Sequence, residues 1–511
     1  MTFAAFLSAA FVVIEYAIKI VAIGVVPENR RPSSSTAWLL LILFLPVVGL
    51  PLFLLLGSAT INRRRHRIQG QANQLLDEGL ADRPTIPAGV DPPAGIGSLL
   101  HLNRRLTSLP CVTGTYVALY DDYAESFAAM AAAVDEAQRY VDVEIYITAW
   151  DDTSAVLFAA LSRAASRGVE VRLLLDHIGS RKYPGFKHLG RRLDDAGIRW
   201  RYMLPIDLLR GRFRRVDLRN HRKLLVVDGD VAFMGSQNLI DSSYLMPANV
   251  RAGRHWHDAM ICVRGEIVRP IEAVFVVDWY TETGEQLLAE RAQRVPPAVP
   301  VGGPGNAFQL VPSGPGFTTE PNLRLFTSLI HAAQERISIC SPYFVPDESL
   351  LAAVTTAGYR GIDIELFVSE QADQFMVDHA QSSYYRALLE AGVRIRRYPS
   401  PAVLHTKFLV IDGRVGVIGS SKWTCAASGS TKRSACSPSA ATPSPPSTNS
   451  PTGTAPSAAN SPSPSGASAP TCSATSTASS ASPRPSSNPP LTPGRRLPFR
   501  STARPTALAL D

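Results

Sequence analysis

Two long apolar segments open the chain. FAAFLSAAFVVIEYAIKIVAIGVV (3–26) and TAWLLLILFLPVVGLPLFLLLG (36–57) are each about one bilayer long, and the short polar loop PENRRPSSS separates them. This pattern predicts a transmembrane helical hairpin within residues 1–60. A cleaved signal peptide is the alternative interpretation, which the missing basic n-region and the immediate second segment disfavour.

The charged residues near these segments indicate an orientation. The cluster RRRHR (63–67), directly after the second segment, is denser in positive charge than Arg30 and Arg31 in the loop. The positive-inside rule therefore predicts a multi-pass protein of the plasma membrane, with the rest of the chain in the cytoplasm and its basic cluster against anionic headgroups. Glu15 and Lys19 lie four residues apart on one helix face, where we expect them to pair; a functional role inside the membrane is the alternative.

Beyond a mixed linker at 61–115, one pattern of apolar and polar positions occurs twice. VDVEIYITAWDDTSAVLFAALSRAASRGVEVRLLL begins at Val141, and ISICSPYFVPDESLLAAVTTAGYRGIDIELFV begins at Ile337. AGIRWRY and AGVRIRRY follow, and after them HRKLLVVDGDVAFMGSQN and HTKFLVIDGRVGVIGSSK. The sequence thus predicts an internal duplication, with a first repeat at 116–300 and a second at 301–422. Strands that alternate with helices predict an α/β fold of mainly parallel sheets covered by helices.

A histidine and a lysine stand two residues apart in each repeat. His221 with Lys223, and His405 with Lys407, therefore project from the same face of a strand. A single such histidine is most often a satisfied core residue. Two copies at matching places in a duplication favour a functional role instead.

An aspartate completes the motif in each repeat. Asp228 and Asp412 are each followed by glycine between two apolar runs, which is typical of a two-residue hairpin turn. For these aspartates we favour a structural role over direct chemistry.

Paired imidazoles and ammonium groups suit the chemistry of a phosphodiester. Two fixed ammonium groups can stabilise the charge on the phosphate oxygens in the transition state. One neutral imidazole can then attack phosphorus while the other, protonated, gives a proton to the departing alkoxide. Neither a metal nor another cofactor is needed for this scheme.

The repeated H-x-K-x-x-x-x-D with a trailing Gly-Ser resembles the phospholipase D superfamily, and more specifically the bacterial cardiolipin synthases. The resemblance runs from Met1 to Ser421 and includes RNHRKLLVVDG, DWYTETGE, SPYFVPDESL and SSYYRALLEAGV. It implies two α/β/α sandwich repeats that join two phosphatidylglycerols into cardiolipin and release glycerol, through a phosphatidyl-histidine. It also implies that His221 is the nucleophile and His405 the general acid and base, although the sequence is symmetric on that point.

Further residues match the family's motifs one at a time. Ser236 and Asn238 in GSQN match the polar loop beside the phosphate, as does Ser420 in the second repeat. Asp258 in HWHD matches the acidic residue that holds the catalytic imidazole by its other nitrogen. HWHD could alternatively be a metal site, but two histidines at i and i+2 with no third ligand nearby disfavour that reading.

A basic stretch precedes the first motif. RGRFRRVDLRNHRK places Arg219 and four further arginines (Arg210, Arg212, Arg214 and Arg215) next to the predicted nucleophile. The bland interpretation is a solvated basic loop. We slightly favour a role in gripping the anionic headgroup, and Arg219 is our candidate for substrate binding.

The second motif changes character at Lys422, where the family pattern predicts asparagine. One codon choice for KWTCAASGSTKRSACS, read one frame over, spells MDMRSFGLNEEVSLL, which resembles the family's continuation. We therefore interpret residues 423–511 as an out-of-frame reading, which truncates the second repeat and removes the glutamate expected to orient His405. The alternative is an evolved, disordered tail rich in Ser, Pro and Ala. The frameshift interpretation predicts a chain that is poorly active or poorly folded.

Composition narrows the choice of partners. The formal net charge is +8, but the tail after residue 423 holds seven basic residues and one acidic residue, so the body is nearly neutral. This argues against nucleic acid as the substrate, although the same motif occurs in nucleases. The expected partners are phosphatidylglycerol and anionic membrane lipids. A phospholipase that uses water or another alcohol, and an inactive membrane protein, are the remaining alternatives; both half-sites lie in one chain, so dimerisation is not required.

Overall fold

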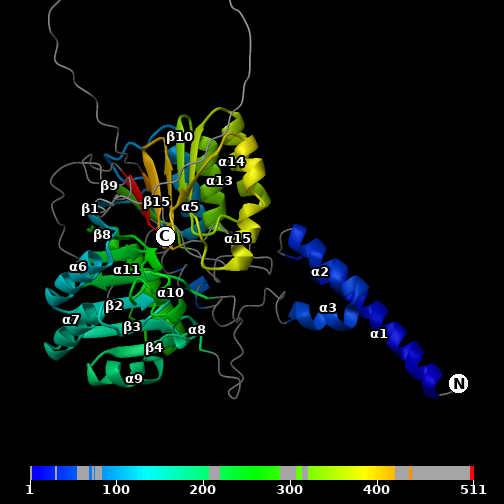
Figure 1. Cartoon of the computed structure of the whole chain (residues 1–511), viewed down its shortest axis with the longest axis horizontal. Coiled ribbons are helices and arrows are strands. Elements are labelled where there is room, and N and C mark those ends of the chain that lie inside the picture. Colours follow the sequence, from blue (N-terminus) through cyan, green and yellow to red (C-terminus); the bar gives the residue numbers. More distant parts are fainter. Residues whose placement is uncertain are drawn as a thin grey trace, which may run out of the picture. The chain divides into compact units, whose positions relative to one another are not determined.

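The computed structural model describes residues 3–28, 32–54, 68, 70, 71, 74, 83–205, 219–287, 306–312, 320–420, 437–439 and 507–510. The N-terminal region contains α1 (Phe3–Val25), α2 (Pro32–Phe44) and α3 (Pro46–Leu52) (Figure 1). Within these described ranges, α1 is the one helix long and apolar enough to cross a membrane. The predicted pair on α1 is confirmed, because Lys19 Nζ lies 2.5 Å from Glu15 Oε1.

Within the described residues, the second apolar segment is not one continuous helix. It breaks at Leu45, because Pro46 has no backbone N–H to continue the ladder and begins a new helix instead. α3 packs so closely on α2 that a Cβ on Gly49 would lie 2.7 Å from the carbonyl oxygen of Leu41. The described part of this region is therefore one long helix and two short ones, and the membrane hairpin stays a prediction.

The body is built on a 15-stranded sheet in which the two repeats join edge to edge. The first repeat runs in the order β1 (Val112–Tyr120), β8 (Met260–Arg264), β6 (Val231–Gly235), β5 (Lys223–Val227), β2 (Tyr140–Ile145), β3 (Glu170–Asp176), β4 (Arg199–Met203). The second runs β9 (Asn306–Leu310), β17 (Ala507–Leu510), β15 (Val415–Ile418), β14 (Phe408–Ile411), β10 (Arg336–Cys340), β11 (Asp363–Ser369), β12 (Arg394–Tyr398). β1 pairs with β9 antiparallel (Figure 1), and the shared strand order confirms the predicted duplication.

The sheet is more mixed than the sequence suggested. β2, β3 and β4 are parallel, as are β10, β11 and β12, because a helix connects each strand to the next. The hairpins that carry the His-Lys motifs instead add antiparallel strands to β2 and β10. The prediction of mainly parallel sheets was therefore wrong for the motif strands.

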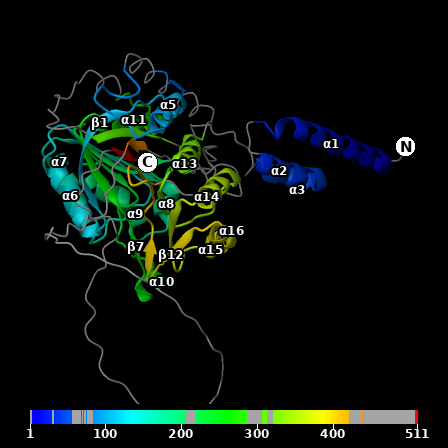
Figure 2. The ribbon, with the colours of Figure 1, turned by 90° about the horizontal axis from the view of Figure 1, so that it is seen from above.

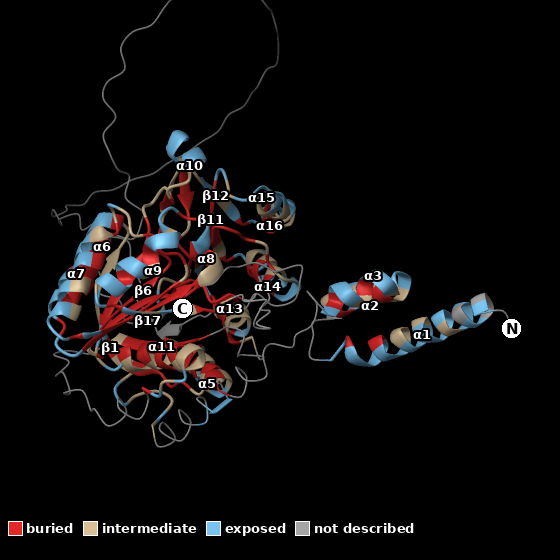
Figure 3. Ribbon diagram, turned by 90° about the horizontal axis from the view of Figure 1, so that it is seen from below, coloured by how far each residue is buried: buried red, intermediate tan, exposed pale blue. Residues whose placement is uncertain are grey.

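Helices cover both faces of the sheet (Figures 2 and 3). In the first repeat, α6 (Tyr123–Asp135), α7 (Ala155–Ser166) and α9 (Phe186–Asp195) pack on one face. A second core runs through both repeats under α5 (Ile96–Thr107), α11 (Val268–Thr283), α13 (Pro321–Ala332) and α14 (Glu348–Tyr359). Short helices α8 (His177–Arg181), α10 (Pro247–Arg251), α15 (Phe375–Ser382) and α16 (Tyr385–Glu390) complete the described set.

The segment that we interpreted as a linker contributes to this core. Leu100 of α5 is fully buried, and Gln309 of β9 donates hydrogen bonds to the carbonyl oxygens of Leu100 and Leu109. Asn103 in turn donates to the carbonyl of Leu310. Residues from 83 onward therefore belong to the folded body.

The two repeats differ at one strand position. In the first, β8 lies antiparallel between β6 and β1. In the second, β17 (Ala507–Leu510) lies parallel to both neighbours between β15 and β9, and β16 (Ser437–Ser439) also pairs with β9. The strand beside β15 thus has the opposite direction from its counterpart, while the rest of the predicted tail lies outside the described residues.

Candidate active site

A small parallel sheet brings the two repeats together at the site. β7 (His255–His257) from the first repeat pairs with β13 (Ala402–Leu404) from the second. The backbone amides of His405 and Thr406 then both donate to the carbonyl oxygen of His257, at 2.8 and 2.9 Å. Because the two strands are parallel and in register, Asp258 and His405 directly follow them at the same end.

Asp258 and His405 form the closest contact between the repeats at this point. Asp258 Oδ1 lies 2.6 Å from Nδ1 of His405, the arrangement that the family motif implied. Burial would raise the pKa of the Asp258 carboxyl, but the neighbouring His405 and Lys407 outweigh it and hold that pKa below its usual value. The carboxylate therefore stays ionised at neutral pH and can accept the Nδ1 proton, which directs the Nε2 lone pair of His405 outward.

Several charges act on His405 from both repeats. Burial lowers the pKa of its imidazole, Asp258 opposes that effect, and Lys407 and Lys223 lower the pKa further. Lys223 comes from the first motif and His405 from the second, so the two half-sites share one electrostatic environment. The net result is an imidazole that is neutral at neutral pH.

The two lysines have matching positions. Each is buried, and each Nζ donates to the carbonyl oxygen of the histidine two residues earlier. The distance from Lys223 Nζ to the carbonyl oxygen of His221 is 2.6 Å, and Lys407 donates to the carbonyl oxygen of His405. The ring of Tyr146 lies over His221, with 3.6 Å between centroids, and Lys223 Nζ is 5.5 Å from the same ring. The motif spacing thus produces the same local geometry twice.

A buried polar network on both sides of His221 escaped the sequence analysis. Asn220 donates to Glu144 at 2.6 Å and to Asp278 at 2.8 Å, and Arg222 forms an ion pair with Asp278. These side chains are buried and come from β2, the motif segment and α11. The available signal was an aspartate inside the apolar run VFVVDWY, which needs a buried partner.

The second repeat replaces this network with smaller groups. Strand pairing puts Cys340 at the position of Glu144, since Cys340 faces Phe408 as Glu144 faces Leu224. Cys340 Sγ donates to the carbonyl of Thr406 at 3.2 Å. The two half-sites are therefore equivalent in their histidines and lysines but not in the groups behind them.

The predicted phosphate-loop residues make mostly protein contacts. Ser236 Oγ accepts from the amide of Ala259 at 3.1 Å and also bonds Asp258. Asn238 accepts from the amide of Ile147 at 3.1 Å and donates to Tyr244 Oη at 2.7 Å. Direct contact of Ser236 and Asn238 with a phosphate remains a prediction.

Ser420 and Arg219 each have buried polar atoms that make no hydrogen bond to a described residue. Ser420 Oγ is buried without a hydrogen-bond partner among the described residues. Arg219 donates from Nη1 to Asp176 at 3.4 Å and to the carbonyl of Leu204 at 2.6 Å, while its Nε and Nη2 bond no described group. Binding of substrate by either residue also remains a prediction.

Gly235 in the Gly-Ser pair has a steric role. A Cβ at this position would lie 2.1 Å from the carbonyl oxygen of Ala259. Glycine therefore lets β6 approach the segment that follows Asp258, and the amide of Ser236 bonds the same carbonyl at 2.9 Å.

Asp228 and Asp412 lie in hairpin turns, as predicted, although each loop has three residues because Val227 pairs with Val231 and Ile411 with Val415. Asp228 has a φ of 53° and Asp412 of 49°. Asp228 accepts from the amides of Gln138, Arg139 and Tyr140 at 2.8 to 2.9 Å. Asp412 accepts from the amides of residues 334, 335 and 336 in the same way. These contacts fix the start of β2 and β10.

We expect Asp228→Ala to destabilise the protein while leaving the site's chemistry intact. Three backbone amides would lose their acceptor, which costs about 2 kcal/mol in the free energy of unfolding. Chemical denaturation of the variant and its parent measures this difference. Asp230→Ala is the matched control in the same turn, because the one side-chain contact of Asp230 within the described residues is an exposed ion pair with Arg264 at 3.9 Å. An Asp228→Ala variant of unchanged stability but lost turnover would instead indicate a chemical role.

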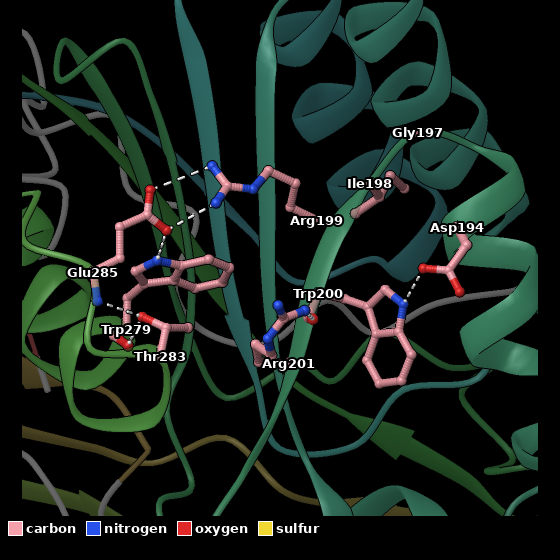
Figure 4. Close-up of a pocket in the computed structure, with 9 residues that line it drawn as sticks. All are labelled: Asp194, Gly197, Ile198, Arg199, Trp200, Arg201, Trp279, Thr283 and Glu285. Carbon is pink, nitrogen blue, oxygen red and sulfur yellow. Dashed lines mark hydrogen bonds and ion pairs between the residues drawn. The ribbon is translucent and has the colours of Figure 1, made fainter.

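A cavity of about 410 Å³ lies elsewhere, beside β4 and the end of α11 (Figure 4). Glu285 in its wall already accepts from Arg199 and from Trp279 Nε1, both at 2.9 Å. None of its lining residues belongs to either motif. Across the described ranges, no three His, Cys, Asp or Glu residues gather closely enough to hold a metal ion.

Comparison with known proteins fits this geometry. A family profile described as cardiolipin synthase, PLD-like domain, matches residues 130–279 and 326–433, and one described as phospholipase D-nuclease N-terminal matches residues 16–58. A cardiolipin synthase of Geobacillus thermodenitrificans is 33% identical over 411 residues, which cover 80% of each chain. The chain belongs to the cardiolipin synthase family. Cardiolipin synthase A of Pectobacterium atrosepticum is 30% identical over 78% of this chain and 82% of its own.

The aligned length extends the family membership to both repeats and both His-Lys motifs. Among solved structures, a phosphatidylserine synthase of Haemophilus influenzae aligns with a TM-score of 0.46 at 15% identity, over 66% of this chain and 85% of its own. The cardiolipin synthase family profile continues past Ser420 to residue 433, and so includes the start of the segment where the motif pattern changes.

Proposed function

We propose that this chain is a phosphatidyltransferase that joins two phosphatidylglycerols into cardiolipin and releases glycerol. The observation that carries the proposal is the meeting of the two motifs, in which Asp258 and Lys223 of the first repeat act on His405 of the second. Membership of the cardiolipin synthase family supports the choice of lipid.

The reaction would proceed in two displacements at phosphorus. His221 Nε2 attacks one phosphatidylglycerol, the bond from phosphorus to glycerol oxygen breaks, and His405 gives that oxygen a proton. The hydroxyl of a second phosphatidylglycerol then gives its proton to His405 and attacks phosphorus, which breaks the phosphorus–nitrogen bond and frees His221. Lys223 and Lys407 would stabilise the charge on the phosphate oxygens.

The same electrostatics would adjust His405 to its task. Its imidazole is neutral because burial and two lysines outweigh Asp258. A phosphodiester anion beside these groups would offset the lysines and raise the pKa of His405. The substrate itself would thus help to protonate the acid that the first displacement needs.

We also propose a membrane location for this reaction. α1 would anchor the chain in the plasma membrane, the region that includes α2 and α3 would add a second membrane segment, and the catalytic repeats would face the cytoplasm. Within this proposal, residues 1–60 are the membrane part and 61–115 lead into the repeats at 116–300 and 301–422. The apolar character of α1 and the basic cluster at 63–67 support it.

We propose further that residues 423–511 are read out of frame. The support is the family motif in the neighbouring frame and the reversed direction of β17 at the position that β8 occupies in the first repeat. On this view the second repeat lacks its own strand beside β15.

An assay with labelled phosphatidylglycerol in mixed micelles tests the activity. We expect cardiolipin and glycerol in equal amounts, from the 511-residue chain or, with higher turnover, from a chain with the reading frame restored at codon 422. Thin-layer chromatography and glycerol release measure both products. Phosphatidic acid as the main product would identify a hydrolase instead, and no lipid turnover by the restored chain would reject the proposal.

A further inference from the structure

A tyrosine lies behind the Asp258–His405 pair and has no part in the reaction scheme above. Tyr123 is the first residue of α6, whose N-cap Asp122 accepts from the amide of Glu125 at 2.9 Å. Its hydroxyl donates to Asp258 Oδ2 at 2.6 Å, while Asp258 Oδ1 holds His405 Nδ1 at the same distance. Asp258 therefore connects a phenol of one element to an imidazole of another.

The surroundings of Tyr123 keep its hydroxyl a donor. Tyr123 is buried, and burial followed by the Asp258 charge raises the pKa of its phenol well above the usual value, so it stays protonated. Tyr244 is a further hydrogen-bonding neighbour of the phenol, and Asn238 Nδ2 fixes Tyr244 Oη at 2.7 Å. The phenol therefore keeps its proton and donates a hydrogen bond to the Asp258 carboxylate.

We propose that Tyr123 is a positioning residue that acts on His405 through Asp258. By occupying Oδ2, its proton fixes the carboxylate rotamer that presents Oδ1 to Nδ1 of His405. By sharing the carboxylate charge, it also weakens the pull of Asp258 on the imidazole proton. The inference uses the proposed function only in giving His405 a proton-transfer role.

No sequence signal indicates this role, because a tyrosine at the start of a helix most often packs in the core. Tyr123 does pack, with its ring 6.2 Å from that of Phe127. A buried phenol needs a hydrogen-bond partner whatever its role, but here that partner is the carboxylate that holds His405.

The test measures the protonation of His405 without turnover, on the full 511-residue chain. Hydrogen–deuterium exchange at the imidazole Cε1, followed by mass spectrometry across pH, gives a midpoint for His405. The groups that act on this midpoint are Asp258, Lys407, Lys223 and, through Asp258, Tyr123 and Ser236. Because activity is not read, failure of the proposed reaction would leave this result unaffected.

Two changes of Tyr123 should move the midpoint in opposite directions. Tyr123→Phe removes the donor, which leaves more charge on Asp258, so the midpoint should rise. 3-Fluorotyrosine at the same position is a stronger donor of nearly the same shape, so the midpoint should fall. Opposite shifts from two nearly isosteric changes are not expected of a residue that only fills space.

Tyr120→Phe is the matched control, because Tyr120 lies three residues away and stacks on Phe233 instead. We expect the Tyr120→Phe protein to have the same His405 midpoint as the parent. The proposal is overturned if 3-fluorotyrosine at position 123 leaves the midpoint unmoved, or if Tyr120→Phe moves it as far as Tyr123→Phe does. Should Tyr123→Phe fail to fold, the fluorinated protein decides alone, since it retains the hydrogen bond.

Discussion

His221→Asn should lower cardiolipin synthesis by about 10³- to 10⁴-fold, because it removes the proposed nucleophile. The loss should be in kcat, since an amide of similar size leaves the pocket filled. Turnover is measured in the chain with the restored frame, where the starting activity is highest. His188→Asn, on the exposed surface of α9, is the matched control and should keep full activity.

His221→Asn and His405→Asn together test which histidine is the nucleophile and which is the general acid and base. If His221 is the nucleophile, lipid labelled at phosphorus should slowly become attached to the His405→Asn protein and remain there, because that protein lacks both the acid of the first displacement and the base of the second. The His221→Asn protein should trap none. Trapped label on the His221→Asn protein alone would reverse the two roles.

The repeats and the hairpin turns of the motifs could be predicted because their signals are local. The prediction that each histidine and lysine lie on one strand was wrong, because β5 begins at Lys223 and β14 only at Phe408, so both histidines precede the strands. Asp-Gly between two apolar runs predicts a hairpin from four residues. We predicted two-residue loops and the structure has three-residue loops. The loop length depends on which strand residues pair, and the sequence does not show that pairing.

What the sequence could not show are contacts between distant segments. The network of Asn220, Glu144 and Asp278 joins positions up to 134 residues apart, and Tyr123 meets Asp258 across 135. No periodicity records such a meeting. The helix break at Pro46, by contrast, could have been predicted from the proline. We missed it because the residues on both sides of Pro46 are continuously apolar. In α5, the flanking Pro and Gly residues masked an amphipathic helix.

The asymmetry of the two half-sites has a physical consequence. His405 has Asp258 behind it, held by Tyr123 and Ser236. In the first repeat, Asp258 lies two residues before β8, so the matching carboxylate for His221 would lie two residues before the strand beside β15. That strand position is held by β17, whose direction is reversed. Our prediction that the lost glutamate orients His405 was therefore wrong, because Asp258 already holds that imidazole, and the proposed frameshift would damage the support of His221 instead.

Restoring the reading frame should raise turnover by at least about 100-fold over the 511-residue chain. One inserted base would put asparagine in place of Lys422 and continue with MDMRSFGLNEEVSLL, which returns an acidic residue to orient an imidazole. It would also supply an antiparallel strand between β15 and β9, so the restored chain should resist denaturant better. Paired assays of the two purified proteins, with unfolding curves, measure both effects.

A matched control inserts a whole codon after Lys422, which leaves the tail in its present frame and should change neither turnover nor stability. Equal turnover in the 511-residue and restored chains would show that the segment after Ser421 serves as it stands, and the frameshift proposal would be abandoned.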